Sequence, residues 1–433
     1  MYTQRHSACY AQQTINNIPC QDDIFPNPVL DSVHMSHFLV FGRHPWLSLA
    51  ETRAILGDAS RPICVEHAAI LESTHWDGQL LQDTLGGCVK LGDIWAKISF
   101  QDLTAERVAD EMLKRPRAER ILFSCTVLSS SPPLKKRFSH LPIELKRALK
   151  SRGHASRWVT GDDGEVAPAA VQKLHLTSEG YDLMIILTAH DAYIGSTTHV
   201  QNADAWSLRD YGRPARDAAN GMLPPKLARM MINLGRGKTP LHETTLLDPF
   251  CGGGTVLMEA ALLGYDRLIG SDLESRQIEH TRRNLDWMVE NHLLDPQRRE
   301  GIQIFSQSAR SIDRSLPAQS VDLIVTEGSL GAPLRGHEPT AFLVQQKQQL
   351  ELLWRETLEA CAVLQPNGGR VVCVWPVFAH IPYEINIDIR DALEDIGYRL
   401  IDPLSGWAQP HELVYSRPDQ RVKRRIVILE KIR

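Results

Sequence analysis

From residue 244 onward, short apolar runs alternate with longer segments in which apolar residues recur every three or four positions. The short runs predict buried strands, and the longer period predicts amphipathic helices. An order of strand, glycine turn, helix and strand is typical of a doubly wound, parallel α/β sheet. The expected strands are 246–247, 268–271, 302–305, 321–325 and 370–375, the expected helices are 255–263, 275–290, 342–363 and 387–396, and a hairpin is expected from 412–415 and 422–429.

Residues 37–200 follow a different order, in which strand patterns outnumber helical ones. This mixture predicts an α+β domain. Ser48 and Glu51 fit a capping box, which predicts that a helix begins there and ends near residue 56. The other expected helices are 105–114 and 141–150, and the expected strands are 38–41, 88–91, 94–100, 120–128, 171–176 and 183–189.

A chain of 433 residues is long enough for two principal domains. Residues 1–36 have neither the basic start nor the apolar stretch of a signal peptide, and we expect a disordered leader. Turn formers and arginines crowd residues 209–217, and the helix that follows Pro224 and Pro225 completes a linker. The expected division is a leader at 1–36, an α+β domain at 37–200, a linker and helix at 201–237, and an α/β domain at 238–433.

Composition narrows the class of protein. Apolar residues make up 43% and charged residues 23%, which is typical of folded globular chains. The eight cysteines contain no C-x-x-C pair and the 17 histidines contain no H-E-x-x-H motif, so no metal site is predicted. Several cysteines lie in apolar runs, as free thiols do in a reducing compartment. We therefore expect a cytoplasmic protein with no membrane span.

The formal net charge of −4 gives no overall attraction to nucleic acid, so any such contact must come from local basic clusters. Clusters occur at 114–120 and 135–157, and they fit either phosphate contacts or the solvated faces of surface helices. The linker carries another basic set, which either contacts an RNA backbone or pairs with Asp210 and Asp217. The candidate RNA-binding residues of this set are Arg209, Arg213, Arg216 and Lys226.

The sequence Asp248-Pro-Phe-Cys-Gly-Gly-Gly-Thr255 follows the first strand of the α/β domain, and Asp272 ends the second strand. Glycines at a strand end let the backbone approach a ligand, and the next strand's acid accepts ribose hydroxyls. A dinucleotide site shares both features, but the third glycine of its motif falls at Leu257, and Asp248 would repel a pyrophosphate. The pattern favours S-adenosylmethionine, whose ammonium group Asp248 would help to hold. The candidate cofactor-binding residues here are Asp248, Phe250, Gly252, Gly254, Thr255 and Asp272.

Residues 248–255 resemble motif I of class I methyltransferases that modify exocyclic amines in RNA. Further segments resemble the tRNA guanosine-10 N2-methyltransferase family, and the resemblance covers nearly all of the chain after residue 37. It implies a class I, Rossmann-like methyltransferase domain, S-adenosylmethionine as cofactor, tRNA as partner, and an N-terminal THUMP-like RNA-binding region. The further segments are Gly42–Glu51, Leu85–Lys90, Arg209–Tyr211, Gly221–Ala228 and Tyr415–Gln420.

That family has a catalytic Asp-Pro-Pro-Tyr-Gly motif after the fourth strand, where this chain has Glu327-Gly-Ser-Leu-Gly331. An exocyclic amine is a poor nucleophile, and a carboxylate that accepts its N–H bonds orients the lone pair toward the methyl group. Glu327 keeps a carboxylate on a side chain one methylene longer, and Gly328 frees the backbone that proline would restrain.

Two further positions depart from the pattern that the resemblance implies. Leu330 stands where the family has an aromatic residue that stacks on a flipped base, an interaction worth ~1–3 kcal/mol. Ser308 and Ala309 occupy a position where such enzymes often place an acid that contacts the adenine amine, and Ser308 would contact it only weakly.

The sequence predicts methylation of the N2 amine of a guanosine in tRNA, with Glu327, Gly328 and Leu330 as the candidate catalytic residues. Two alternatives stay open. One is an amino-methyltransferase acting on adenine N6 or cytosine N4 of DNA, and the other is a non-catalytic RNA-binding protein with a decayed methyltransferase site. The sequence also leaves open which nucleotide is modified, how many methyl groups are added, and whether a small activating subunit is required.

Overall fold

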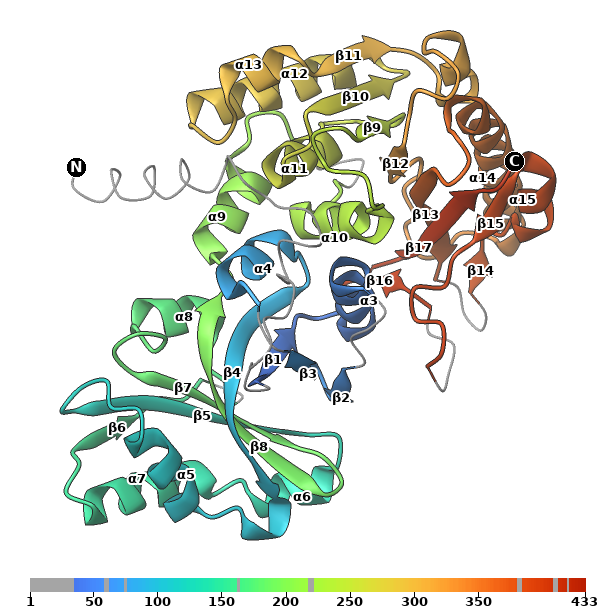
Figure 1. Cartoon of the computed structure of the whole chain (residues 1–433). Coiled ribbons are helices and arrows are strands. Elements are labelled where there is room, and N and C mark those ends of the chain that lie inside the picture. The colour runs from blue at the N-terminus through green and yellow to red at the C-terminus, as the bar shows by residue number, and fades with distance from the viewer. Residues whose placement is uncertain are drawn as a thin grey trace. The chain divides into compact units, whose positions relative to one another are not determined.

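The computed structural model describes residues 35–57, 62–73, 76–161, 164–216, 222–379, 384–407, 412–418 and 420–433. The chain divides into two compact units (Figure 1). Within the described residues, the first unit takes in 35–49 and 56–205, and the second takes in 50–55 and 206–433. All but the last two residues of the leader expected over 1–36 lie outside the described residues.

The first unit is built on an eight-stranded sheet with the order β2-β3-β1-β4-β8-β7-β5-β6. Its helices α5 and α7 pack on each other and bury an apolar cluster that includes Val108 and Leu145. The strands are β1 (Met35–Phe41), β2 (Ile63–Val65), β3 (Ala68–Ser73), β4 (Cys88–Ser99), β5 (Ile121–Ser129), β6 (Ser156–Trp158), β7 (Tyr181–Leu187) and β8 (Asp191–Val200). The helices that begin in this unit are α3 (Pro45–Leu56), α4 (Gly78–Thr84), α5 (Ala105–Leu113), α6 (Pro132–Arg137), α7 (Leu141–Ser151), α8 (Pro168–Lys173) and α9 (Ala203–Ser207).

Three sequence predictions in this unit were wrong. The segment 171–176, expected to be a strand, begins inside helix α8, because Pro168 at the first helical position favours a helix that a short apolar run does not reveal. The strands expected at 88–91 and 94–100 are one strand, β4, which continues through two bulges. Helix α3 begins at Pro45, and the Ser48 hydroxyl donates to the carbonyls of His44 and Gly87 instead of capping a helix.

The second unit confirms the doubly wound α/β fold. Its sheet has the order β11-β10-β9-β12-β13-β17-β15, in which the first five strands are parallel and β17 runs antiparallel to both of its neighbours. The strands are β9 (Thr245–Asp248), β10 (Arg267–Asp272), β11 (Gln303–Ser306), β12 (Leu323–Thr326), β13 (Arg370–Phe378), β15 (Tyr398–Leu400) and β17 (Val422–Lys431), with β14 (Ile385–Asn386) beside β13 and β16 (Val414–Tyr415) beside β17.

Helices cover both faces of this sheet (Figure 1). Helices α11 and α12 lie on one face, where α10 also packs, and α14 lies with α15 on the other (Figure 1). The helices are α10 (Pro225–Gly235), α11 (Thr255–Leu263), α12 (Ser275–Glu290), α13 (Pro296–Glu300), α14 (Thr340–Leu364) and α15 (Arg390–Ile396), with a 3-10 turn, η3, at Ala309–Arg314. The predicted bounds of α11 and α12 are confirmed.

Strand order reverses between β9 and β12, because the chain builds β10 and β11 on one side of β9 and then returns to the other. In sheets of this kind, ligands bind outside the carboxyl ends of the strands at such a switch point. The candidate site is therefore the edge where β9, β10 and β12 end.

Candidate functional site

Three acidic residues mark the carboxyl edge at the switch point. Asp248 is the last residue of β9, Asp272 is the last residue of β10, and Glu327 directly follows β12. Because β9 pairs in parallel with both β10 and β12, these strand ends lie beside one another. The structure thus brings together the carboxylates that the sequence placed in cofactor binding and catalysis.

The loop between Asp248 and α11 turns on two glycines in the left-handed region, Gly252 at φ 51° and Gly254 at φ 80°. Thr281 of α12 lies behind the loop, and its hydroxyl donates to the Gly252 carbonyl over 2.6 Å. A β-carbon at Gly254 would lie 2.9 Å from the Thr281 methyl group. The loop therefore requires glycine at this position and leaves its backbone open to a ligand.

Asp272 is joined to the same loop. Its Oδ2 accepts a hydrogen bond from the Gly252 amide over 3.0 Å, and its Oδ1 accepts one from the Glu274 amide over 3.0 Å. Each carboxylate oxygen has a second acceptor position, and Asp272 is only half-buried, so it can still accept ribose hydroxyls. The neighbouring Leu273 side chain is 73% exposed, which supplies an apolar surface that a purine would cover.

Asp248 is buried, with 2% of the residue exposed. Its Oδ1 accepts a hydrogen bond from the Phe250 amide over 3.1 Å. Burial raises the pKa of Asp248 to about 7, and the charges of Asp272 and Glu327 act in the same direction. A cation beside this carboxyl group would relieve that cost, so Asp248 fits the ammonium group of S-adenosylmethionine.

Ser308 and Ala309 lie at the start of η3. The Gln307 amide donates to the Asp272 carbonyl over 3.0 Å, which holds this turn next to β10. Ser308 is half-buried, whereas Ala309 is buried. Of these two residues, only Ser308 therefore offers a polar side chain that a ligand could reach.

Glu327 has a partner that the sequence did not reveal. The Nε–H of Arg424, on β17, donates to Oε1 of Glu327, and the Arg424 side chain is 5% exposed and that of Glu327 13%. Burial raises the pKa of Glu327, while the charge and the hydrogen bond of Arg424 oppose that rise. The candidate catalytic carboxylate is thus part of a nearly buried ion pair.

Trp354 of α14 explains why the residue after Glu327 is glycine. Gly328 has φ 64°, and a β-carbon there would lie 2.5 Å from the Trp354 ring. Proline, which needs φ near −65°, fits neither this backbone nor this space. Phe250 packs near the same ring, with 5.9 Å between centroids. The packing of Trp354 therefore accounts for glycine at position 328, where the family motif has proline.

Leu330 is half-buried, and Ser329 is exposed. The loop that carries both is attached to α14, because the Ala332 amide donates to Oε1 of Gln346 over 3.0 Å. Leu330 presents no aromatic face. Aromatic rings in the described part of the chain that lie near this loop include Trp354 beside Gly328 and Phe378 beside Gly331, and Phe250 packs near Trp354.

The four basic residues assigned to RNA have different surroundings. Arg209 is buried and pairs with Glu259 of α11 over 2.7 Å, and Arg213 is buried and donates to the Thr255 hydroxyl. These two arginines contribute to the fold of the second unit, so their surroundings favour a structural role over a contact with RNA phosphates. Arg216 is exposed, with its guanidinium 5.2 Å from the Tyr211 ring centroid, and Lys226 is half-buried beside Trp206.

Asn284 of α12 joins the linker to the glycine loop, and the sequence did not single it out. Its amide exchanges two hydrogen bonds of 2.9 Å with the backbone of Ala215 and donates to the Gly253 carbonyl over 2.8 Å. Asn284 is fully buried. Residues 213–215 are therefore a structural part of the candidate cofactor loop.

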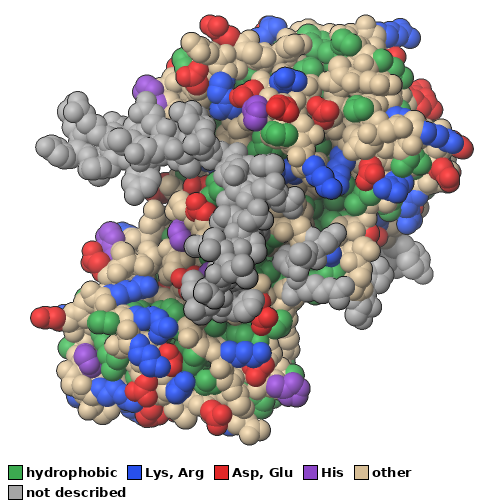
Figure 2. Space-filling model, in the orientation of Figure 1, with side chains coloured by type: hydrophobic (Ala, Val, Ile, Leu, Met, Phe, Trp, Pro, Cys, Tyr) green, Lys and Arg blue, Asp and Glu red, His purple; other side chains and the backbone are tan. Residues whose placement is uncertain are grey.

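The basic clusters of the first unit are mixed with acidic side chains, as the visible face in Figure 2 shows. Lys114 and Arg115 both pair with Glu111, and Lys135 pairs with Glu66. Arg117 donates to the Leu176 and Gly180 carbonyls. For these residues, the surroundings favour a structural role.

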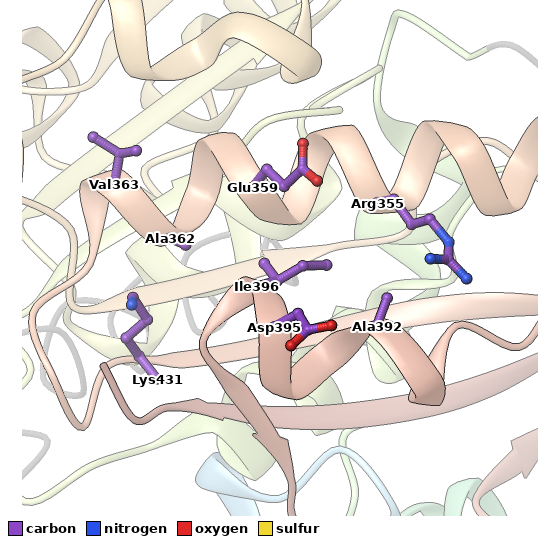
Figure 3. A pocket seen from close by; sticks show the side chains of 8 residues that line it. All are labelled: Arg355, Glu359, Ala362, Val363, Ala392, Asp395, Ile396 and Lys431. Carbon is purple, nitrogen blue, oxygen red and sulfur yellow. The ribbon is translucent and has the colours of Figure 1, made fainter.

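The pocket in Figure 3, of about 510 Å³, lies away from the candidate site. It is bounded by α14, α15 and Lys431. Lys431 directly follows Glu430, which pairs with Arg370 at the amino end of β13, whereas the candidate site lies at the carboxyl ends of the parallel strands. Its charged side chains have both signs, with Arg355 and Lys431 among the lining residues together with Glu359 and Asp395. It contains none of the residues at the switch point.

Among the described residues, no helix is long and apolar enough to cross a membrane. No group of three or more His, Cys, Asp or Glu side chains in the same residues is arranged to hold a metal ion. The six cysteines that the structure describes are free thiols.

Residues 213–374 match a family model described as the RMKL-like methyltransferase domain. The chain is 33% identical over 176 residues to a tRNA (guanine(10)-N2)-dimethyltransferase of Methanothermobacter thermautotrophicus, covering 40% of this chain and 44% of that protein. It is 30% identical over 226 residues to a protein of the same name from Methanocaldococcus jannaschii, covering 50% of this chain and 54% of the other. The chain thus spans about half the length of these curated relatives.

Among solved structures, TrmN from Thermus thermophilus has a similar fold, with a TM-score of 0.50 and 18% sequence identity. The similarity covers 92% of this chain and all of that one.

Proposed function

Since residues 213–374 form a methyltransferase domain of the RMKL-like family, we propose that the protein methylates the N2 amine of a guanosine in tRNA, with S-adenosylmethionine as cofactor. The observation that carries the proposal is the position of Glu327, a nearly buried carboxylate at the switch point next to Asp248. The names of the relatives supply the substrate class, and the geometry supplies the chemistry.

The residues present fit the cofactor. Asp272 has acceptor capacity for ribose hydroxyls, Leu273 exposes an apolar face, and buried Asp248 gains from a neighbouring cation. Gly252 and Gly254 keep the loop free of side chains. When bound, S-adenosylmethionine supplies an electrophilic methyl group, and the protein's task is to align the amine with it and to take up a proton.

Glu327 performs both tasks in this proposal. Its carboxylate accepts the N2–H bonds of the guanine and so directs the nitrogen lone pair toward the methyl group. When the nitrogen gains a methyl group it loses a proton, and the Glu327 carboxylate accepts it. Burial, which raises the pKa of this carboxyl group, favours that step.

The first unit would dock the tRNA as a THUMP-like region, and Arg216 would contact the RNA from the exposed part of the linker. We place the reaction in the cytoplasm and assign it no metal ion. A small activating subunit would be revealed by activity in cell extract that is absent from the pure protein.

The test is transfer of tritiated methyl from S-adenosylmethionine to unmodified bulk tRNA or to duplex DNA, with EDTA present, followed by nucleoside mass analysis. The proposal expects N2-methylguanosine from tRNA and no label in DNA. Label in DNA adenine or cytosine would replace it with DNA methylation. If the protein binds tRNA but transfers no methyl group, either as the pure protein or with added cell extract, the alternative of a non-catalytic RNA-binding protein is favoured.

A further inference from the structure

The ion pair between Glu327 and Arg424 has hydrogen-bonding capacity left over. Oε1 of Glu327 accepts from Nε of Arg424, and both side chains are nearly buried. Among the described residues, the second oxygen of Glu327 and the two terminal amino groups of Arg424 have no hydrogen-bond partner. None of these atoms is among the fully buried polar atoms without a partner, so they reach solvent and are open to a polar ligand.

The order of the atoms defines that partner. The single Nε–H of Arg424 is used within the pair, so the groups left for a ligand are the two carboxylate oxygens of Glu327, which are acceptors, and a terminal amino group of Arg424, which is a donor. The Watson–Crick edge of guanine presents the N2 amine, N1–H and O6, which are two donors followed by an acceptor. The two rows complement each other at all three positions.

Other bases match this row less well. Adenine presents an N6 amine and then the N1 acceptor, with a carbon next, so it satisfies at most two positions. Cytosine presents one donor followed by two acceptors, which would set N3 against a carboxylate oxygen. A carboxylate joined to a guanidinium therefore selects guanine through its chemistry.

We propose that Glu327 and Arg424 together recognise the guanine edge, with Glu327 accepting from N2 and N1 and Arg424 donating to O6. The proposal rests on the function above and adds a specificity residue to it. Arg424 is well suited to this role, because its position on β17, opposite Pro376 of β13, places it at the carboxyl end of the neighbouring strand. Arginine contacts to O6 of guanine are a common means of base recognition.

The experiment compares two tRNAs that differ at the nucleotide the wild-type protein methylates, which is either guanosine or 2-aminopurine riboside. The second base keeps the N2 amine but lacks both O6 and the N1–H. For the wild type, we expect kcat/KM to be about 10- to 100-fold lower with 2-aminopurine, which is the loss of one or two charge-assisted hydrogen bonds. For Arg424→Met, we expect the ratio between the two substrates to fall by about 3- to 10-fold, because the contribution of O6 is lost while Glu327 still favours the N1–H of guanine.

Arg425→Met is the matched control. Arg425 is the next residue of the same strand and pairs with Glu412, so its loss should leave the ratio at the wild-type value. Arg424→Lys keeps a positive charge and N–H donors on one nitrogen but lacks the planar fork of the guanidinium, and it should retain part of the discrimination if Arg424→Met does not fold.

The wild-type comparison can overturn the proposal without any variant, and the Arg424 variants separate the contribution of O6 from that of N1–H. Formation of N2-methylguanosine with equal activity on 2-aminopurine would overturn the role of Arg424 and leave the proposed function intact. Loss of discrimination in Arg425→Met as well as Arg424→Met would also overturn it. No methylation of the guanosine tRNA at all would overturn the proposed function, and this inference with it.

Discussion

The guanidinium of Arg424 donates a hydrogen bond to the carboxylate of Glu327, across 97 residues of chain. The contact joins β17 to the residue after β12, with β13 between the two strands. It keeps a charge partner next to a carboxylate that burial would otherwise favour in its neutral form. The pH at which Glu327 loses its charge therefore sets the lower pH limit of activity.

The acid limb of the activity profile should depend on Arg424. Burial raises the pKa of Glu327 and Arg424 opposes the rise, and the charge of Glu327 in turn helps to raise the pKa of Asp248. Removing the cation in Arg424→Met leaves the desolvation unopposed, so the pKa rises further and activity is lost at a higher pH. The measurement is kcat/KM on tRNA between pH 5.5 and 9. Arg425→Met is the control and should leave the acid limb unchanged. An unchanged acid limb in Arg424→Met would contradict this account.

Asp248→Asn should stabilise the protein at neutral pH while weakening cofactor binding. The pKa of Asp248 is raised to about 7 by burial, above its ordinary value, so the folded state favours the neutral acid. Its contribution to stability is complete below the ordinary pKa of about 3.9 and is lost as pH rises to about 7. At pH 8, asparagine avoids a cost on the order of a few kcal/mol.

Thermal unfolding at pH 4 and pH 8 checks this prediction. The melting temperature of Asp248→Asn should exceed that of the wild type by several degrees at pH 8 and by much less at pH 4. Calorimetric titration should show weaker binding of S-adenosylmethionine. Equal gains at both pH values would show that burial of this carboxyl group does not control the difference.

Gly328→Ala should be more destabilising than a matched change at Gly368. Both glycines have positive φ, 64° and 87°, so alanine costs about 1–2 kcal/mol at each. Only Gly328 has a neighbour in the way, the Trp354 ring at 2.5 Å, which adds about 1–3 kcal/mol, whereas the space at Gly368 is open. Calorimetric unfolding of the two variants measures the difference. Equal losses would mean that Trp354 moves freely aside.

Asn284→Ala should weaken cofactor binding without touching the cofactor. The change removes the hydrogen bonds that join Ala215 to Gly253 and leaves buried backbone groups unsatisfied, at about 1–3 kcal/mol each. Asn291→Ala is the control, because Asn291 is exposed and donates only to the Trp287 carbonyl. The dissociation constant for S-adenosylmethionine should rise in the first variant and stay constant in the second.

The second unit was easier to predict than the first, for physical reasons. Helices α11 and α12 end where a glycine or a polar turn stops a long apolar period, so their bounds were predicted correctly. In the first unit, α8 is only six residues long, too short for its period to differ from that of a strand. Strand β8 carries Gly195 and a run of small polar residues, so no apolar run indicated it.

The candidate site divides in a similar way. Asp248, Asp272 and Glu327 each end or follow a strand, and such positions can be recognised along the chain. Arg424 carries no comparable signal, because it lies between Lys423 and Arg425 in a charged stretch that resembles a solvated strand. Only the pairing of β17 with β13 brings it to the site.

The burial of Arg209 was equally hidden. Its partner Glu259 lies on a helix 50 residues away, while Asp210 is adjacent in sequence and suggested a local pair. A guanidinium in a turn-rich segment looks exposed until the fold covers it.

Single-turnover methylation of tRNA by Glu327→Gln tests the central claim most directly, beside wild type and the surface control Glu412→Gln. The account predicts a rate at least about 100-fold lower for Glu327→Gln, because the amide cannot accept the proton and is a weaker acceptor for the amine. Binding of tRNA and cofactor should stay within a few fold, and Glu412→Gln should match wild type. A wild-type rate in Glu327→Gln would contradict the assignment of Glu327 as the catalytic carboxylate.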